Sequence, residues 1–432
     1  MRTTHILGAL ALCAGALPAQ QRTGARAMAA PGDSLRLTRG EAIGAALKAN
    51  PQLEILREQW LQARARHVSA IALPDPTLTY SLDDEPRVLQ LGKAGSKNAQ
   101  LDFAIPFPDK LRLRGSIASS DVRSADFRYM QVKQQVAAEA SKAYDALLAT
   151  RRHGRDLREG RALADSVVQR AQARFNAGFV PRLDVIKARV DLAQSDNDLI
   201  ANARDLANAE AALNRLMGSP LGTPIAQQDS LSIPRALPEL EVLERAAYDS
   251  RPDLGDLDAQ RAGQRANTNL LKEYWLPDFT LGASHDYKTP GSPGYSAGIG
   301  VSLPLFFWQH SKGDVAESQH RERELAATYR DLSAAVGQDV RAAYASAATA
   351  LRQAIFIRDE LLPAARESYR AVSVAYSLGG ASSLEVIDAR RTLLDAQTQY
   401  SDALANANSA RADLEFAVGR PLDSFLPGGS RE

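Results

Sequence analysis

A gapless repeat of about half the chain constrains this sequence more than any other feature. Residues 174–221 and 375–422 align without a gap, and both segments close on Gly-x-Pro-Leu. Near their start they share a glycine, Gly178 in the first segment and Gly379 in the second. The repeat distance is far longer than the roughly 20–50 residues of a solenoid repeat, which indicates duplication of a whole subdomain. We therefore expect two halves with the same architecture.

Both segments carry apolar residues at seven-residue steps. One stripe runs from Val185 to Leu213, and its equivalent runs from Val386 to Leu414. Such a stripe keeps one seam facing a partner helix and favours left-handed supercoiling. Only 6% of the 432 residues are aromatic, which also favours long helices over compact globules. The repeated segments are therefore predicted to be packing helices.

Each half is expected to begin with a short helix followed by a longer one. Residues 37–50 fit a short helix with Thr38 as N-cap and Glu41 as its capping-box partner, and Pro51 opens the next helix. The second half repeats this pattern. Later in each half comes a very long helical stretch, which turns at a glycine placed where a helix C-cap needs positive φ. These stretches cover residues 109–177 and 312–378, and Pro363 is expected to bend the second.

Between these helices the apolar period changes to two, directly after a Leu-Pro-Asp in each half. Alternation predicts one hairpin at about 77–106 and another at about 278–304. One face of each strand is apolar and the other is small or polar. Aromatic residues cluster at the strand ends, namely Trp275, Phe306, Phe307 and Trp308.

Two interpretations fit this strand pattern equally well. Apolar strands with aromatic ends are typical of a bilayer-spanning barrel, in which aromatic rings lie at the headgroup level. The same pattern fits sandwich or edge strands whose aromatic residues belong to a core. Four strands are too few to close a barrel with an aqueous pore, and an open strand edge is not tolerated in lipid. The membrane interpretation therefore requires an oligomer.

The N-terminus predicts export. Residues 1–19 combine Arg2, an apolar run and small residues, which is the plan of a secretory signal. The sole cysteine, Cys13, lies inside this signal, so we expect no disulfide or thiolate site in the mature chain. Acylation of Cys13 is the alternative, which the bulky Leu12 before it disfavours. The expected organisation is a signal peptide at 1–19, a first repeat at 20–217, a Pro-rich linker at 218–238, a second repeat at 239–422 and a loose tail at 423–432.

The sequence offers little for catalysis, cofactors or nucleic acid. It has no phosphate loop, no HExxH and no GxSxG, and its six histidines are scattered. A net charge of +1 gives no general attraction to nucleic acid. We expect no enzyme activity, no cofactor and no bound metal.

The order of helices, hairpin, very long helix, glycine turn and heptad helix, all repeated behind a signal, resembles the TolC family of outer-membrane efflux channels. The resemblance covers nearly the whole mature chain and is most specific at residues 174–189 and 375–390 and at the closing Gly-x-Pro-Leu. It implies a mainly α fold with a small β part: a homotrimer whose long coiled-coil helical barrel crosses the periplasm. Four strands per chain would form a 12-stranded transmembrane β-barrel in contact with outer-membrane lipid.

The function implied is a passive exit duct in the cell outer membrane. The implied partners are a periplasmic adaptor (membrane fusion) protein, docked near the hairpin turns at Gly178 and Gly379, and an inner-membrane efflux pump. Compact members of the family with similar hairpin entries often serve heavy-metal exporters, so metal cations are our first expectation for the cargo. Drugs or other small molecules are the second. The alternative from another class is a periplasmic coiled-coil scaffold or adaptor without a membrane barrel.

The resemblance also places a candidate gate at the periplasmic tip. Glu385 and Asp388 lie three apart just after the second glycine turn, on one helix face. Three chains would form an acidic ring that favours cations and weakens in acid, because crowded carboxylates raise each other's pKa. A solvated charged face is the competing interpretation. Asp184 and Tyr376 match positions of the family's closure network; Ala381 replaces its expected arginine, and Lys187 is a candidate substitute.

Overall fold

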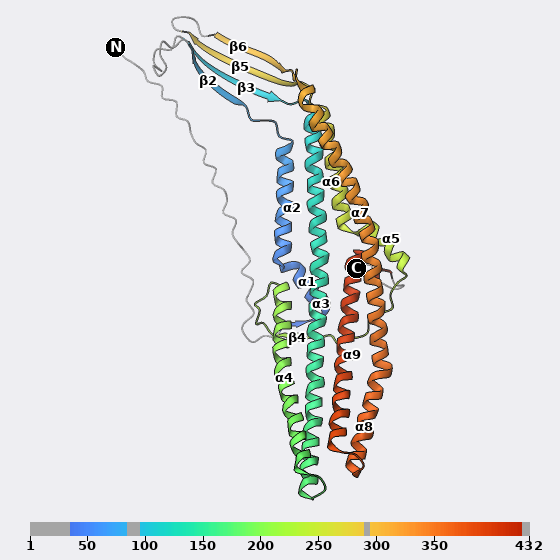
Figure 1. Cartoon of the computed structure of the whole chain (residues 1–432). Helices are drawn as coiled ribbons and strands as arrows, with labels where there is room; N and C mark the ends of the chain where they lie inside the picture. The colour runs from blue at the N-terminus through green and yellow to red at the C-terminus, as the bar shows by residue number, and fades with distance from the viewer. Residues whose placement is uncertain (1–34, 84–95, 289–293, 426–432) are drawn as a thin grey trace, which may run out of the picture.

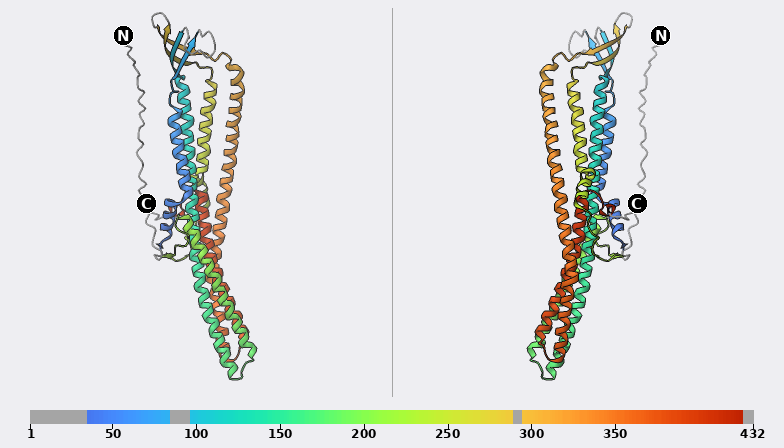
Figure 2. Two further views of the ribbon diagram at one scale, coloured as in Figure 1. Left: turned by 90° about the vertical axis from the view of Figure 1, so that its left-hand side faces the viewer. Right: turned by 90° about the vertical axis from the view of Figure 1, so that its right-hand side faces the viewer.

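The computed structural model describes residues 35–83, 96–288 and 294–425. The expected signal peptide with Cys13, the tail after residue 425 and parts of both hairpin loops lie outside the described residues. The molecule is long and narrow, with strands at one end and two helical turns at the other (Figure 1). Two side views show the helices running along the length between these ends (Figure 2).

The two halves have the same order of elements, as the repeat predicted. The first half contains α1 (Arg39–Ala49), α2 (Pro51–Ala70), β2 (Thr77–Asp83), β3 (Ser96–Ile105), α3 (Pro108–Asn176) and α4 (Arg182–Leu216). The second half contains α5 (Leu240–Ser250), α6 (Pro252–Lys272), β5 (Asp278–Lys288), β6 (Gly294–Ser302), α7 (Phe307–Phe356), the π-helical turn η1 (Ile357–Leu361), α8 (Leu362–Leu378) and α9 (Ser383–Val418). A short 3₁₀ turn, η2 (Leu422–Phe425), ends the described chain.

Both predicted hairpins join one antiparallel sheet in the order β2-β3-β5-β6. Phe103 pairs with Leu281, and Leu281 pairs with Ile299, so the three apolar side chains form a row across three strands. All three are exposed in this chain. The opposite face carries small and polar residues, for example in the row Gln100, Ser284 and Ser296. Within the described chain, the outer edges of β2 and β6 have no neighbouring strand.

The helices pack side by side as a wall. Near the strands the contacts run in the order α2, α3, α6 and α7, and near the turns they run α4, α3, α9 and α8. The long helix α3 is central to both parts because its 69 residues reach about 100 Å at 1.5 Å per residue. The wall therefore ends on α2 and α4 along one edge and on α7 and α8 along the other.

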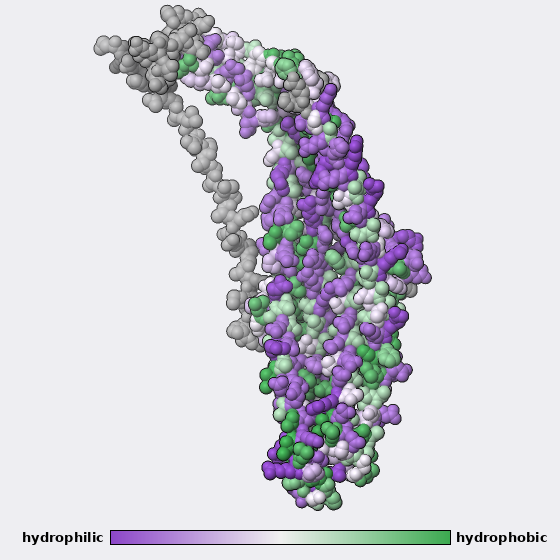
Figure 3. Space-filling view, viewed as in Figure 1, coloured by the Kyte–Doolittle hydropathy of each residue, from purple (hydrophilic) through white to green (hydrophobic). Residues whose placement is uncertain are grey.

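The heptad stripes face the interior of this wall. Val386, Leu393 and Leu414 of α9 are buried, and so are Val185 and Leu213 of α4. One apolar cluster joins α5, α7 and α9, and a second joins α1, α3 and α4. The hydropathy surface shows hydrophobic residues in patches among hydrophilic ones along the helices (Figure 3). In the part of the chain that the structure describes, no helix has both the length and the apolarity needed to cross a bilayer.

Two details differ from the sequence-based expectation. The Pro-rich linker contains a strand, β4 (Ile225–Gln227), which pairs in parallel with β1 (Leu35–Leu37) and so ties the linker to the start of the chain. Near Pro363, where a bend was expected, the structure has a π-helical turn over residues 357–361, after which the helix continues as α8. A proline has no backbone N–H and its ring crowds the preceding turn, and a wider turn relieves both effects. The equivalent helix α3 has no such interruption.

Candidate functional site

The site predicted from the sequence lies at the helical turns farthest from the strands. Gly178 and Gly379 have φ of 78° and 87°, which confirms the left-handed conformation expected at both turns. The amide of Gly380 donates to the carbonyl of Ala375 at 2.8 Å, and that of Phe179 donates to the carbonyl of Arg174 at 2.9 Å. The turns hold several exposed apolar side chains at the tip, which sequence analysis did not single out: Phe179, Leu183, Leu378 and Leu384.

Glu385 has a structural role that we had not predicted. Its Oε2 accepts hydrogen bonds from the amide of Ser382 at 2.6 Å and from the Ser382 hydroxyl at 2.9 Å. The Ser382 hydroxyl in turn accepts from the amide of Glu385, which completes a capping box at the start of α9. The backbone hydrogen bond from Ser382 is the main cause that lowers the pKa of Glu385 below its ordinary value. This effect opposes the rise in pKa expected from crowding in a trimer.

Asp388 lies one turn further along α9, and its side chain is exposed, as is that of Glu385. The spacing thus places both carboxylates on the same accessible face, as predicted. The two exposed carboxylates place negative charge on the surface of this turn.

The predicted closure network is only partly assembled within one chain. Tyr376 is 1% exposed, and its hydroxyl has no hydrogen-bond partner in the described chain. Burial is the main cause that raises its pKa, and the negative charge of Asp184 adds to the rise. The cation near Tyr376 is Arg174 of α3, whose guanidinium lies 4.8 Å from the ring centroid and donates to the Tyr376 carbonyl at 2.9 Å. Lys187 is exposed on α4.

A buried ion pair about two turns above the tip was missed from the sequence. Arg390 of α9 donates to Oδ2 of Asp191 of α4 from Nε at 3.0 Å and from a terminal nitrogen at 2.7 Å. Its other terminal nitrogen donates to the carbonyl of Gly160 in α3 at 3.2 Å. Arg391 binds the second oxygen of Asp191 at 3.0 Å. We call these four residues the Asp191 cluster.

The sequence did contain a signal for this cluster. Arg390 follows the buried Ile387 by three residues and precedes the buried Leu393 by three, so helical spacing places it on the inward face. Asp191 likewise follows the buried Ala188 by three residues. A charge at an inward position requires a partner, because an unpaired buried ion is very costly.

Aromatic side chains mark the junction between strands and helices, as predicted. Trp275, Phe306 and Trp308 are exposed, and the rings of Phe306 and Trp308 lie 5.8 Å apart. Phe307 begins α7 rather than ending a strand. Nearby, Lys110 of α3 binds Asp278 of β5 at 3.0 Å, which fastens the sheet to the helical wall.

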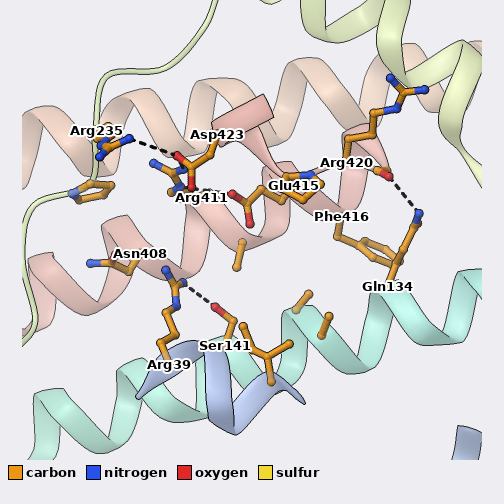
Figure 4. Close-up of a pocket in the computed structure, with 18 of the residues that line it drawn as sticks. Arg39, Gln134, Ser141, Arg235, Asn408, Arg411, Glu415, Phe416, Arg420 and Asp423 are labelled. Carbon is orange, nitrogen blue, oxygen red and sulfur yellow. Dashed lines mark hydrogen bonds and ion pairs between the residues drawn. The ribbon is translucent and has the colours of Figure 1, made fainter. Parts of the chain in front are cut away.

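A cluster of charged side chains lines a cavity of about 610 Å³ at mid-length, between α1, α3, α9 and the linker (Figure 4). Arg411 is nearly buried and binds Asp423 at 2.7 Å and Glu415 at 3.3 Å, and Arg235 of the linker lies 4.0 Å from Asp423. Because carboxylates neutralise these guanidinium groups, the arrangement is typical of a junction that holds the linker and the chain end against the wall.

The same junction contains a titratable carboxyl. Arg39 binds Asp145 at 2.8 Å and the hydroxyl of Ser141 at 2.5 Å. Burial raises the pKa of Asp145 to about 6, although the charge of Arg39 lowers it. Among the described residues no group of three His, Cys, Asp or Glu side chains has the geometry to hold a metal ion.

Comparison with known proteins gives consistent matches over both halves. A family model described as "Outer membrane efflux protein" matches residues 42–219 and 243–420. The cobalt-zinc-cadmium resistance protein CzcC of Cupriavidus metallidurans is 23% identical, covering 89% of this chain and 90% of that protein. The outer membrane protein TolC of Vibrio cholerae is 25% identical, covering 80% of this chain and 82% of that protein. The crystal structure of the Campylobacter jejuni CmeC outer membrane channel is similar with a TM-score of 0.74 at 17% identity, covering 88% of this chain and 85% of that one.

Proposed function

The chain belongs to the outer membrane efflux protein family, and on that premise we propose how its duct selects what passes. It is the outer-membrane exit duct of a tripartite efflux system, a passive channel and not an enzyme. Its helical part extends into the periplasm, and it works as a trimer with an adaptor and a pump. This assignment decides against the periplasmic scaffold that the sequence alone left open.

The observation that carries the membrane assignment in physical terms is the four-stranded sheet. Its apolar row of Phe103, Leu281 and Ile299 is exposed and its other face is small and polar, which suits lipid outside and water inside. Both sheet edges lack a neighbouring strand in the described chain. Unpaired edges are costly in lipid, so β6 of one copy is expected to pair with β2 of the next.

For the cargo, our first proposal is metal cations, with drugs or other small molecules as the second. The relative CzcC, named for cobalt, zinc and cadmium resistance, supports the first choice. The acidic pair at the tip supports it too, since a ring of carboxylates lowers the energy of a passing cation. A duct need not hold its cargo, and this proposal requires no metal site.

For the gate, we propose that Glu385 and Asp388 set the cation preference. Three copies would bring six carboxylates to one aperture. The capping box fixes Glu385 and lowers its pKa, so its charge should persist to lower pH than that of a free glutamate. Asp184, Lys187 and Tyr376 would stabilise the closed tip, with Tyr376 acting through its ring beneath Arg174.

The test is ion selectivity of the purified full-length protein in a planar bilayer, measured as the reversal potential in asymmetric KCl. The double variant Glu385→Gln with Asp388→Asn removes both charges, and glutamine can still complete a capping box. We expect the cation preference to fall several-fold while the protein stays folded. A reversal potential equal to that of the unmodified protein would refute the gate proposal.

The matched control is Glu41→Gln. Glu41 completes the same type of capping box with Thr38, at 2.7 Å from the Thr38 amide, but in α1 and away from the tip. Its removal should leave the reversal potential unchanged. The turns at Gly178 and Gly379 are proposed to dock the adaptor, and cross-linking at these turns would detect that contact.

A further inference from the structure

The Asp191 cluster joins α4, α3 and α9. These are three of the four helices of the lower wall, by which we mean the part of the helical wall near the turns. Arg390 is 3% exposed and Asp191 is 2% exposed, so both charges lie away from water. The bidentate contact of one guanidinium with one carboxylate oxygen, together with the bond to the Gly160 carbonyl, fixes α9 against α4 and α3 at once. Buried ion pairs require good geometry, and loss of one partner leaves an uncompensated charge. Separation of α4 from α9 would therefore be strongly opposed.

The internal repeat shows that this junction has no equivalent. The two copies are offset by 201 positions, from Arg174 to Ala375, so Asp191 corresponds to Thr392 and Arg390 corresponds to Arg189. Threonine cannot form an ion pair. Arg189 is exposed and binds Gln172 of its own half at 3.2 Å, whereas the Thr392 hydroxyl donates to the carbonyl of Asp388 in its own helix.

The order of helices shows where the equivalent junction would lie. Within one copy the ion pair crosses from α4 to α9 over α3 in the series α4, α3, α9, α8. When copies close a ring, α8 of one copy is followed by α4 of the next. The repeat-equivalent contact therefore crosses from α9 over α8 to α4 of the next copy, and it brings Thr392 towards Arg189 of the next copy. The repeat-equivalent positions at the seam therefore carry a threonine and an arginine in place of the ion pair found within each copy.

We propose that the Asp191 cluster clamps α4 to α9, so that the lower wall of each copy moves as one unit and the duct opens at the seams between copies. This inference rests on the duct function proposed above. Asp191 and Arg390 are positioning residues, because they act on the aperture only through the helices that they hold.

The experiment compares two cross-links at repeat-equivalent positions in the full-length protein. Gln194 and Leu394 line one groove of about 440 Å³ between α4 and α9, so Gln194→Cys with Leu394→Cys links the two helices within a copy. The equivalent positions across the seam are Asp395 and Ala193 of the next copy. Asp395 also lines the groove within a copy, so covalent dimers and trimers on a denaturing gel are needed to show that this pair has joined two copies. Cys13, the only natural cysteine, lies in the expected signal peptide. A bismaleimide long enough to span the groove joins each pair.

We expect the link within a copy to leave the bilayer current within twofold of the unlinked protein. The link across the seam, Ala193→Cys with Asp395→Cys, should reduce the current at least tenfold and should yield covalent dimers and trimers on a denaturing gel. A tenfold loss caused by the link within a copy would overturn the proposal, and so would an unaffected current after linking across the seam.

A second measurement judges the clamp without relying on conduction, so that failure of the duct function can be told apart from failure of the clamp. In Arg390→Met, hydrogen exchange of the backbone amides near residues 186–195 and 386–395 should accelerate at least tenfold. Arg390→Lys, which keeps the charge but not the bidentate geometry, should give a smaller acceleration. The control is Arg161→Ala, which removes a half-exposed ion pair with Asp196 between α3 and α4. Equal exchange in Arg390→Met and the control would refute the clamp.

Discussion

Replacing Tyr376 by phenylalanine should stabilise the tip rather than open it. The side chain is fully enclosed by residues of α3, α4 and α9, and its hydroxyl has no partner in the described chain. Because the oxygen is already shielded within one copy, a neighbouring copy has no path to it without movement of these helices. Tyr376→Phe removes the unpaired hydroxyl and keeps the ring beneath Arg174.

The magnitude follows from the cost of an unpaired buried polar group, which is about 1–3 kcal/mol. Loss of the few contacts made by the oxygen atom offsets part of this gain. We therefore expect about 1 kcal/mol of added local stability. At room temperature this corresponds to roughly fivefold slower exchange of the amide hydrogens in α8 and the first turns of α9.

The chain offers a matched control of opposite sign. Tyr144 is 0% exposed, and its hydroxyl donates to the carbonyl of Leu37 at 2.8 Å, with Asp229 at 3.4 Å. Tyr144→Phe loses a satisfied hydrogen bond and should cost about 0.5–1.5 kcal/mol. Exchange of the amides around residue 144 should accelerate accordingly. Hydrogen–deuterium exchange with mass spectrometry on both variants, in detergent, gives both results in one experiment.

Faster exchange at the tip of Tyr376→Phe would refute this reasoning, and so would a raised bilayer current. Either result would mean that the hydroxyl has a partner in the assembled trimer. Arg174 is the charge that most affects the pKa of this hydroxyl and Asp184 comes second, so the predicted closure network would then act through one of these two side chains.

Three further predictions concern pH and the helix ends. The pKa of Asp145 is raised from 3.8 to about 6, so the folded protein binds this proton more tightly than the unfolded chain does. The contribution of Asp145 to stability should therefore fall as pH rises between these two values. Asp145→Asn should remove this pH dependence from thermal unfolding measured between pH 4 and 7. Gly419→Ala should lower the unfolding temperature more than Gly178→Ala does. Both glycines have φ of 78°, so alanine at either position should lower the free energy of unfolding by about 1–2 kcal/mol. Only at Gly419 would the new Cβ also lie 3.0 Å from the Ser250 carbonyl oxygen. Ser382→Ala should cost about 1 kcal/mol through loss of the cap on α9, a loss that Thr38→Ala should match at α1; no change in thermal stability of either variant would contradict the capping assignment.

Local chemistry was readable from the sequence wherever it depends on neighbouring residues. The capping box of Thr38 and Glu41 and the left-handed glycines at both turns were predicted and are confirmed. The strands were predicted within a few residues because alternation is a direct consequence of a two-sided sheet. The same Ser-x-x-Glu pattern was present at Ser382, but attention to the charge of Glu385 hid its structural role.

Features that depend on distant partners could not be predicted in this way. The strands β1 and β4 are three residues each, too short for a period, and they lie in segments far apart along the chain. Asp191 and Arg390 are 199 positions apart, so only the packing of α3 between their helices shows that they meet. The π-helical turn before Pro363 arises from how a long helix accommodates a proline, a choice that the sequence leaves between a kink and a wider turn.

The antiparallel pairing of β3 with β5 means that a single sheet is shared by both halves of the duplication. Each half supplies one hairpin and one pair of long helices, which is a complete unit of the ring. A ring of three chains is therefore built from six such units, two in each chain. Because the two units of one chain differ in sequence, as Asp191 and Thr392 do, successive junctions around the ring carry different side chains and can differ in strength.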